Sequence, residues 1–182
     1  KEGFTILLIG HEGHDEVIGT MGEAPDAIIL VEDEEDVDRI EVADESKVAY
    51  LTQTTLSVDD ANRIIKKIRE RFPDVKSPPK GDICYATQNR QEAVRIIADD
   101  VQLVLVVGSQ NSSNSQRLKE IAIEQGKAAY LIDGVDDIDD SWFESVDTMM
   151  ITAGASAPEN LVQGCVDYMK RNFDAELESR VI

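Results

Sequence analysis

The chain has 182 residues, of which 37 are acidic and 18 are basic, so its net charge near neutral pH is −19. That charge argues against nucleic acid or an anionic membrane surface as a partner, because both are polyanions. With 42% hydrophobic residues, the chain can bury a core and is predicted to be globular. Its longest apolar run, residues 103–107, is too short to cross a bilayer. The two cysteines form no disulfide framework, which fits a reducing compartment, and we expect a cytoplasmic protein.

Short apolar runs alternate with segments of helical period, a pattern typical of parallel strands joined by crossover helices. In chain order, we expect strands at residues 5–9, 27–31, 48–51, 83–85, 102–107, 128–132 and 149–151. The better defined helices are expected at residues 57–72, 89–98, 115–125 and 158–173. Ser57 is expected to cap the first of these helices and Ser156 to open the last, with Pro158 in its first turn. The pattern predicts an α/β fold.

A proline-rich stretch near mid-chain, residues 72–81, is the expected linker, because it holds three of the five prolines. We therefore expect two similar lobes, residues 1–77 and 78–157, followed by a C-terminal helix and tail at residues 158–182. An acidic run at residues 32–36 is interpreted as the solvated start of a short helix, where carboxylates favour the positive end of the helix dipole. A second acidic run at residues 136–140 is interpreted in the same way, with no chemistry assigned to it.

Small hydroxyl and amide side chains follow several of the expected strands. Open α/β sheets bind ligands at the carboxyl ends of their strands, next to helix N-termini that attract anions. The loops that follow this rule lie at residues 10–16, 52–55, 86–89, 108–115 and 152–156. Any one of them is explained by helix capping alone, but several together favour a shared oxyanion ligand. No Walker-type loop or Gly-x-Gly-x-x-Gly fingerprint is present.

The two histidines, His11 and His14, lie three residues apart in the first of these loops. This spacing differs from the i, i+4 pair of a zinc-protease helix and comes with no obvious third ligand, so zinc is a weak interpretation. Glu16 follows in the same loop, and a carboxyl group near an imidazole and threonine hydroxyls can deliver protons. The alternative, that the histidines only tie the loop to itself, stays open on spacing alone.

The two cysteines have different settings. Cys165 is in step with Leu161 and Met169 on the apolar face of its expected helix, which indicates core packing. Cys84 stands beside a polar loop, where its thiolate could bind a metal or cluster, but a buried structural thiol is the alternative. One cysteine alone cannot hold an iron-sulfur cluster.

Five motifs at these loops resemble the 4-hydroxy-3-methylbut-2-enyl diphosphate reductases, iron-sulfur enzymes of the non-mevalonate isoprenoid pathway. The motifs come in the family's order and at close to its spacing. They are LIGHEGHDEV at residues 8–17, TQTTLSVDD at 52–60, DICYATQNRQ at 82–91, VGSQNSSNS at 107–115 and TAGASAP at 152–158.

The resemblance implies a trefoil of three α/β lobes around a 4Fe-4S cluster, with Cys84 as one of three cysteine ligands. It implies that Glu16 delivers protons with Thr54 nearby. The expected diphosphate ligands are His14, Ser112, Ser113, Asn114 and Ser156. The implied partners are a small allylic diphosphate substrate and ferredoxin or flavodoxin as the electron donor. The implied products are isopentenyl and dimethylallyl diphosphate.

The sequence also departs from the family pattern. The family's other two cysteine ligands, and two further diphosphate-binding histidines, lie upstream of anything present in this chain. We therefore expect a fragment that lacks the N-terminal lobe, cannot assemble a full cluster alone, and has a C-terminal tail that returns towards that lobe. Asp15 stands where the family often has proline. Two competing hypotheses remain: a non-catalytic phosphoanion-binding module, and a flavodoxin-like domain, which is disfavoured because no aromatic pair is placed to sandwich a flavin.

Overall fold

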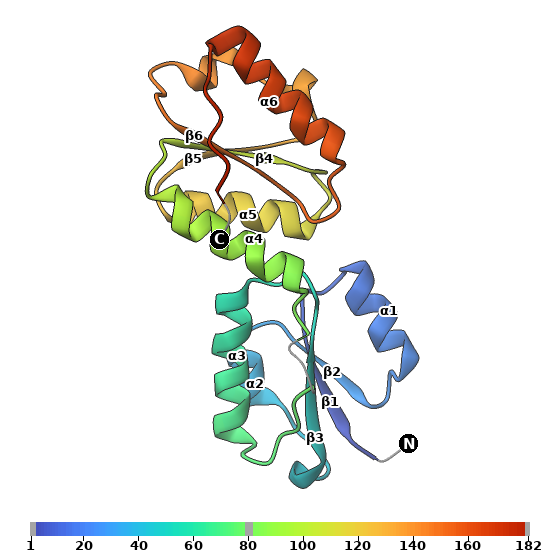
Figure 1. Ribbon diagram of the computed structural model, residues 1–182. Coiled ribbons are helices and arrows are strands. Elements are labelled where there is room, and N and C mark those ends of the chain that lie inside the picture. The colour runs from blue at the N-terminus through green and yellow to red at the C-terminus, as the bar shows by residue number, and fades with distance from the viewer. Residues whose placement is uncertain (1–2, 79–81, 181–182) are drawn as a thin grey trace. The chain divides into compact units, whose positions relative to one another are not determined.

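The computed structural model describes residues 3–78 and 82–180 and divides into two compact units, Lys1–Cys84 and Tyr85–Ile182. Each unit contains one parallel three-stranded sheet with helices on both faces (Figure 1). The expected α/β class with two similar parallel-sheet lobes is therefore confirmed. The division falls after Cys84, whereas the sequence analysis placed it after Ser77.

The first unit is built from three strands and three α-helices that alternate along the chain. Its sheet has the order β2-β1-β3, and both strand pairs are parallel. Because β1 is central, its carboxyl end lies beside the carboxyl ends of both neighbours, and Ile9 pairs with Val31 and with Thr52. The elements are β1 (Thr5–Ile9), α1 (Asp15–Glu23), β2 (Ile28–Val31), α2 (Glu34–Arg39), β3 (Val48–Thr52) and α3 (Val58–Arg71), with the 3-10 helix η1 (Glu45–Lys47) before β3.

Alternation along β1 sends its side chains to two cores. Leu7 and Ile9 pack on the face covered by α2 and α3, together with Ile64 and Ile68. Leu8 packs on the opposite face, against Val17 of α1. Figure 1 shows this arrangement, with α1 on one side of the sheet and α2 and α3 on the other. The first turns of α1 and α3 are thereby brought to the same end of the sheet as the carboxyl ends of the strands.

The second unit repeats this plan with an additional helix at its start. Its parallel sheet has the order β5-β4-β6, and all five residues of the central strand β4 are buried. The elements are α4 (Tyr85–Ala98), β4 (Leu103–Val107), α5 (Ser113–Glu124), β5 (Ala128–Ile132), β6 (Met149–Ala153) and α6 (Glu159–Phe173), with the 3-10 helices η2 (Val135–Asp137) and η3 (Asp140–Phe143) between β5 and β6.

The two faces of β4 carry separate cores. Val104 and Val106 pack against α4 and α5, where Val94 and Leu118 are fully buried. Leu103, Leu105 and Val107 pack on the opposite face with residues of α6, and Figure 1 shows α6 on the face away from α4 and α5. The C-terminal helix is therefore part of this unit's core.

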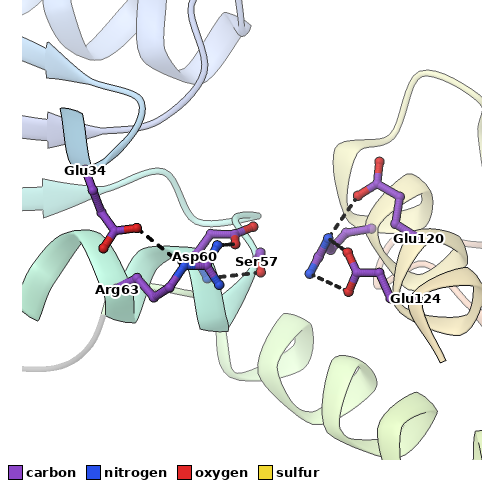
Figure 2. A network of polar contacts seen from close by, with 7 residues as sticks. Glu34, Ser57, Asp60, Arg63, Glu120 and Glu124 are labelled. Atoms are coloured by element: carbon purple, nitrogen blue, oxygen red, sulfur yellow. Dashed lines mark hydrogen bonds and ion pairs between the residues drawn. The ribbon is translucent and has the colours of Figure 1, made fainter. Parts of the chain in front are cut away.

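Charged side chains reinforce the helix starts and the outer surfaces of both units. Ser57 Oγ accepts a hydrogen bond from Asp60 N at 3.3 Å, so the predicted cap of α3 is confirmed. Arg63 pairs with Asp60 and, at 3.6 Å, with Glu34, which ties α3 to the start of α2 (Figure 2). In the second unit, Arg117 pairs with Glu120 and Glu124, also drawn in Figure 2. The Arg63 pairs are exposed on both sides and contribute at most about 1 kcal/mol each.

Two local predictions were wrong, and one helix was not predicted. Residues 83–85 form no strand, because Ile83 instead joins the first unit's core and Tyr85 already begins α4, four residues before the expected helix. The helix α1 was not expected, since Gly19 and Gly22 lower its helix propensity, but Val17 anchors it to the sheet. Ser156 does not cap α6, because Pro158 is the N-cap residue and Ser156 lies exposed in the loop before it.

None of the helices in the described ranges combines the length and hydropathy needed to span a bilayer.

Candidate functional site

The loop between β1 and α1 places His14 and Glu16 at the start of a helix. His14 is the N-cap residue of α1, and its Nδ1 accepts a hydrogen bond from Glu16 N at 3.2 Å. Gly13, just before the cap, has a φ angle of +80°, which residues other than glycine rarely adopt. His14 Nδ1 thus acts as the acceptor that caps the first turn of α1.

The Glu16 carboxylate binds Thr54, 38 residues later in the chain. It accepts hydrogen bonds from Thr54 N at 3.0 and 3.2 Å and from Thr54 Oγ1 at 3.0 Å. Both residues are half-buried. The backbone N–H and the hydroxyl group of Thr54 together hold the carboxylate in one orientation. Glu16 is thus fixed at the carboxyl ends of β1 and β3.

The buried side chain of Gln53 forms hydrogen bonds with both of these loops. Its side chain is 1% exposed, its Oε1 accepts from His11 N at 3.1 Å, and its Nε2 donates to Thr55 Oγ1 at 2.9 Å. A Cβ at Gly10 would lie 3.2 Å from Gln53 Oε1 and would overlap Val17, so the loop passes directly over this amide. Gln53 therefore sets the spacing between the loop that carries Glu16 and the loop that carries Thr54.

Cys84 is held beside Thr54 by the backbone. Its N–H donates to Thr54 O at 3.1 Å, and the residue is exposed. Two residues earlier, Asp82 Oδ2 accepts from Thr52 N at 2.9 Å. Because β3 is an edge strand, Thr52 N has no neighbouring strand to bind, and the carboxylate of Asp82 takes that place. The exposed position contradicts the alternative of a buried structural thiol.

A second polar cluster lies in the loop between β4 and α5. Ser112 is the N-cap residue, and its Oγ accepts from Ser115 N at 3.3 Å. Ser113 and Asn114 form the first turn of α5. The Asn114 side chain is 5% exposed, yet neither its Oδ1 nor its Nδ2 has a hydrogen-bond partner among the described residues. A buried amide left without partners costs about 1 to 3 kcal/mol, so this side chain is an exception that packing alone does not explain.

The loop after β6 approaches this cluster closely. A Cβ at either Gly108 or Gly154 would overlap Ser115 Oγ, and one at Gly154 would lie 3.8 Å from Asn114 Nδ2. Only glycine permits the two strand ends to close around the start of α5 in this way. Ser156 follows two residues after Gly154 and is exposed. Within residues 3–78 and 82–180, the structure shows no hydrogen bond between its side chain and Asn114.

The described residues offer one thiolate to a metal centre. No three His, Cys, Asp or Glu side chains within residues 3–78 and 82–180 are grouped so that they could hold a metal ion. Cys165 is fully buried, as predicted, and burial raises its pKa, which disfavours the thiolate that binds metals. Cys84, exposed and next to Thr54, suits one ligand position of a cluster whose other ligands come from elsewhere.

The predicted site residues divide between the two units, and Ser156 is the one for which the described part of the structure shows no contact with the others of its unit. His14, Glu16, Thr54 and Cys84 belong to the first unit, and Ser112, Ser113, Asn114 and Ser156 to the second. Sequence reasoning assigned no role to Gln53, Asp82 or Arg90, although all three stand in the quoted motifs. A glutamine inside an otherwise hydroxyl-rich strand end was the available signal for Gln53.

Two parallel-sheet units with polar groups at the carboxyl ends of their strands define an α/β protein of the ligand-binding class. A family model described as LytB protein matches residues 1–170. The chain therefore belongs to the LytB family.

Its relatives are reductases of one kind. The chain is 63% identical over 182 residues to the 4-hydroxy-3-methylbut-2-enyl diphosphate reductase of Rhodopirellula baltica, covering all of this chain and 57% of that protein. The enzyme of the same name from Pseudomonas putida is 55% identical over 174 residues, which cover 93% of this chain and 55% of that protein. Among solved structures, the reductase of Plasmodium falciparum superposes with a TM-score of 0.87 at 39% identity, over 93% of this chain and 53% of that one. The chain thus spans about half the length of its relatives.

Proposed function

We propose that this chain belongs to a 4-hydroxy-3-methylbut-2-enyl diphosphate reductase and carries its proton-delivery group, one cluster ligand and part of its diphosphate site. The reaction removes the substrate's hydroxyl group with two electrons and two protons, releasing water and forming isopentenyl or dimethylallyl diphosphate. The observation that carries the proposal is the Glu16 carboxylate, bound to Thr54 at 3.0 Å, with Cys84 bonded to the same threonine.

In this proposal, Glu16 holds and transfers the proton. Thr54 fixes the orientation of the carboxyl group, so a proton bound to one of its oxygens is held in a defined direction. Thr54 Oγ1 can pass a proton between the carboxylate and a substrate hydroxyl, since a hydroxyl group both donates and accepts. His14, at the N-cap of α1, is proposed as a further ligand of the diphosphate.

The diphosphate is proposed to bind at the start of α5. The N-terminus of a helix attracts anions through its free backbone N–H groups and its dipole. Ser112 and Ser113 add hydroxyl donors, and the Asn114 amide, unpartnered among the described residues, has a donor to offer. Ser156 would complete this set from the loop before α6.

Cys84 is proposed as one thiolate ligand of a 4Fe-4S cluster in the full-length protein. Such a cluster, when bound, supplies electrons and an open iron that acts as a Lewis acid on the leaving oxygen. Since one thiolate does not hold a cluster, the remaining cysteines would come from a third lobe that completes a trefoil with the two units seen here. Ferredoxin or flavodoxin is the proposed electron donor, and the cytoplasm the proposed location.

Iron content tests the ligand assignment. The full-length protein, reconstituted anaerobically with iron and sulfide, should lose most of its bound iron when Cys84 is changed to Ser. Cys165→Ala is the matched control, because this thiol is buried in the core and its loss should leave iron content unchanged. Equal iron in the Cys84→Ser variant and the wild type would refute the assignment.

Steady-state kinetics of the full-length protein test the proton-delivery role. Glu16→Gln keeps the size of the side chain but has no proton to transfer, so kcat should fall by about a hundredfold or more, while substrate affinity changes little. Asp15→Asn, one residue earlier and exposed, removes the same charge from the same helix turn and should change kcat little. A loss of affinity at normal kcat in Glu16→Gln would contradict the role.

A further inference from the structure

The side chain of Arg90, a residue of α4, contacts the carboxyl end of β6, beside the proposed diphosphate site. It lies in the second turn of α4, and its Nε donates to Ala153 O at 2.9 Å while its Nη1 donates to Ala86 O at 3.2 Å. Ala153 is the last residue of β6. The guanidinium group, which is half-buried, therefore bridges a helix and a strand end.

The hydrogen bond to Ala153 O reaches a carbonyl that no strand can bind. Gly154 N donates to Val107 O of the central strand at 2.9 Å. In a planar trans peptide the C=O and N–H groups point in opposite directions, so Ala153 O faces the open edge of β6. Arg90 is the group that binds it there. The peptide that leads into the loop carrying Ser156 is thus held from both sides.

The same peptide borders the buried amide of Asn114. Gly154 is buried, and the absence of a Cβ there lets it approach Ser115 and Asn114. A shift of the Ala153–Gly154 peptide by a few tenths of an ångström would move the loop after β6 relative to the first turn of α5. Arg90 therefore controls the spacing between two of the loops proposed to hold the diphosphate.

The charge of Arg90 is not balanced by an ion pair with any described residue. Both of its hydrogen-bond partners are neutral carbonyls, and no carboxylate within residues 3–78 and 82–180 forms an ion pair with it. By contrast, Arg95 on the same helix pairs with Glu92 at 4.0 Å. In a chain of net charge −19, a doubly charged anion is repelled at long range, so a half-buried cation without an ion pair at the end of β6 offsets part of that repulsion locally.

We propose that Arg90 is a positioning residue of the diphosphate site, which holds the β6–α6 loop against Asn114 and supplies positive potential to the bound anion. This inference rests on the proposed function. It concerns the strength of anion binding and assigns Arg90 no part in proton transfer.

Binding of inorganic pyrophosphate to the full-length protein, followed by calorimetry, tests the inference without depending on turnover. Arg90→Gln should raise the Kd for pyrophosphate about tenfold, which corresponds to about 1.4 kcal/mol, and Arg90→Lys, which keeps the charge but loses the fork, about threefold. Arg95→Gln is the matched control and should bind like the wild type. In turnover, KM should follow Kd while kcat stays within about twofold.

The salt dependence of the Kd for pyrophosphate distinguishes an electrostatic role of Arg90 in anion binding from a purely structural role. Wild type and Arg90→Lys should lose affinity steeply as sodium chloride is raised, and Arg90→Gln more gradually, because one screened attraction is missing. Equal Kd values, or equal salt slopes, for wild type and Arg90→Gln would overturn the inference. If Arg90→Gln does not fold, the threefold effect of Arg90→Lys decides. A wild-type protein that fails to bind pyrophosphate would overturn the diphosphate site itself, and with it the role of Arg90.

Discussion

Glu16 and Asn114 occupy equivalent positions in the two units but differ in their bonding. Each is the second residue of the helix that follows the central strand, and each lies seven positions after that strand ends, at Ile9 and Val107. Glu16 is fully engaged by Thr54 within its own unit. The Asn114 amide has no partner among the described residues. The same frame thus holds one carboxylate that is fixed by hydrogen bonds, the proposed proton carrier, and one amide without a partner, the proposed diphosphate ligand.

The difference has a physical explanation in what each group must do. A proton carrier must be oriented before the substrate arrives, because misplacement costs rate. A binding group is better left unpaired, because a hydrogen bond within the protein would have to break before the ligand could form one. In this proposal, the unpaired amide lowers the stability of the free protein and raises its affinity for the ligand.

The largest effect is expected at Asn114. Asn114→Leu keeps the number and branching of the side-chain heavy atoms and removes two unpartnered polar atoms, so it should weaken pyrophosphate binding by the full-length protein about a hundredfold while raising the free energy of unfolding by about 1 kcal/mol. Calorimetry and urea denaturation measure the two quantities. Lower stability in this variant would show that the amide is already satisfied, and the contrast between the units would fail.

The equivalent change in the first unit should have the opposite effect on stability. Glu16→Leu leaves the Thr54 N–H and hydroxyl without their acceptor, so the free energy of unfolding should fall by about 1 to 2 kcal/mol. Urea denaturation of the two leucine variants side by side gives the comparison directly. If both variants shift stability in the same direction, the two sites do not differ in the way described.

A smaller effect is expected where Asp82 closes the edge of β3. Asp82→Ala leaves Thr52 N without its acceptor and should lower stability by about 1 kcal/mol, with faster amide hydrogen exchange at Thr52 and Cys84. Asp82→Asn retains an acceptor and serves as the control. Unchanged exchange in Asp82→Ala would mean that this carboxylate does not hold the Cys84 segment against β3.

The smallest effects concern two exposed aspartates that act alike in the two units. The hydroxyl of Ser46 lowers the pKa of Asp44 below its ordinary value, and Ser141 does the same for Asp139. A carboxyl whose pKa is lower in the folded state stabilises it above the ordinary pKa, and this contribution is lost as pH falls through the folded value. Ser46→Ala and Ser141→Ala should each raise the aspartate pKa, measured by NMR titration. A rise at only one position would show that these caps differ.

The element pattern was predictable wherever local signals agreed. The apolar runs of β1 and β5 and the period of Ile64 and Ile68 in α3 correspond closely to the structure, because burial on a sheet or on one helix face leaves its spacing in the sequence. Residues 83–85 were predicted as a strand for the same reason. Ile83 does pack into the core of the first unit, but it does so from a loop. No local pattern distinguishes the two cases.

The α/β class, the two parallel sheets and the polar residues at the strand ends could be predicted from the sequence, because hydrophobic periodicity and helix-capping residues are properties of neighbouring positions. Which of those residues meet is set by the tertiary structure. Thr54 reaches Glu16 across 38 positions, and Arg90 reaches Ala153 across 63, since the order of strands within each sheet sets those distances. It also decided that Asn114 is buried without a partner among the described residues, because burial and hydrogen bonding depend on everything packed around a side chain.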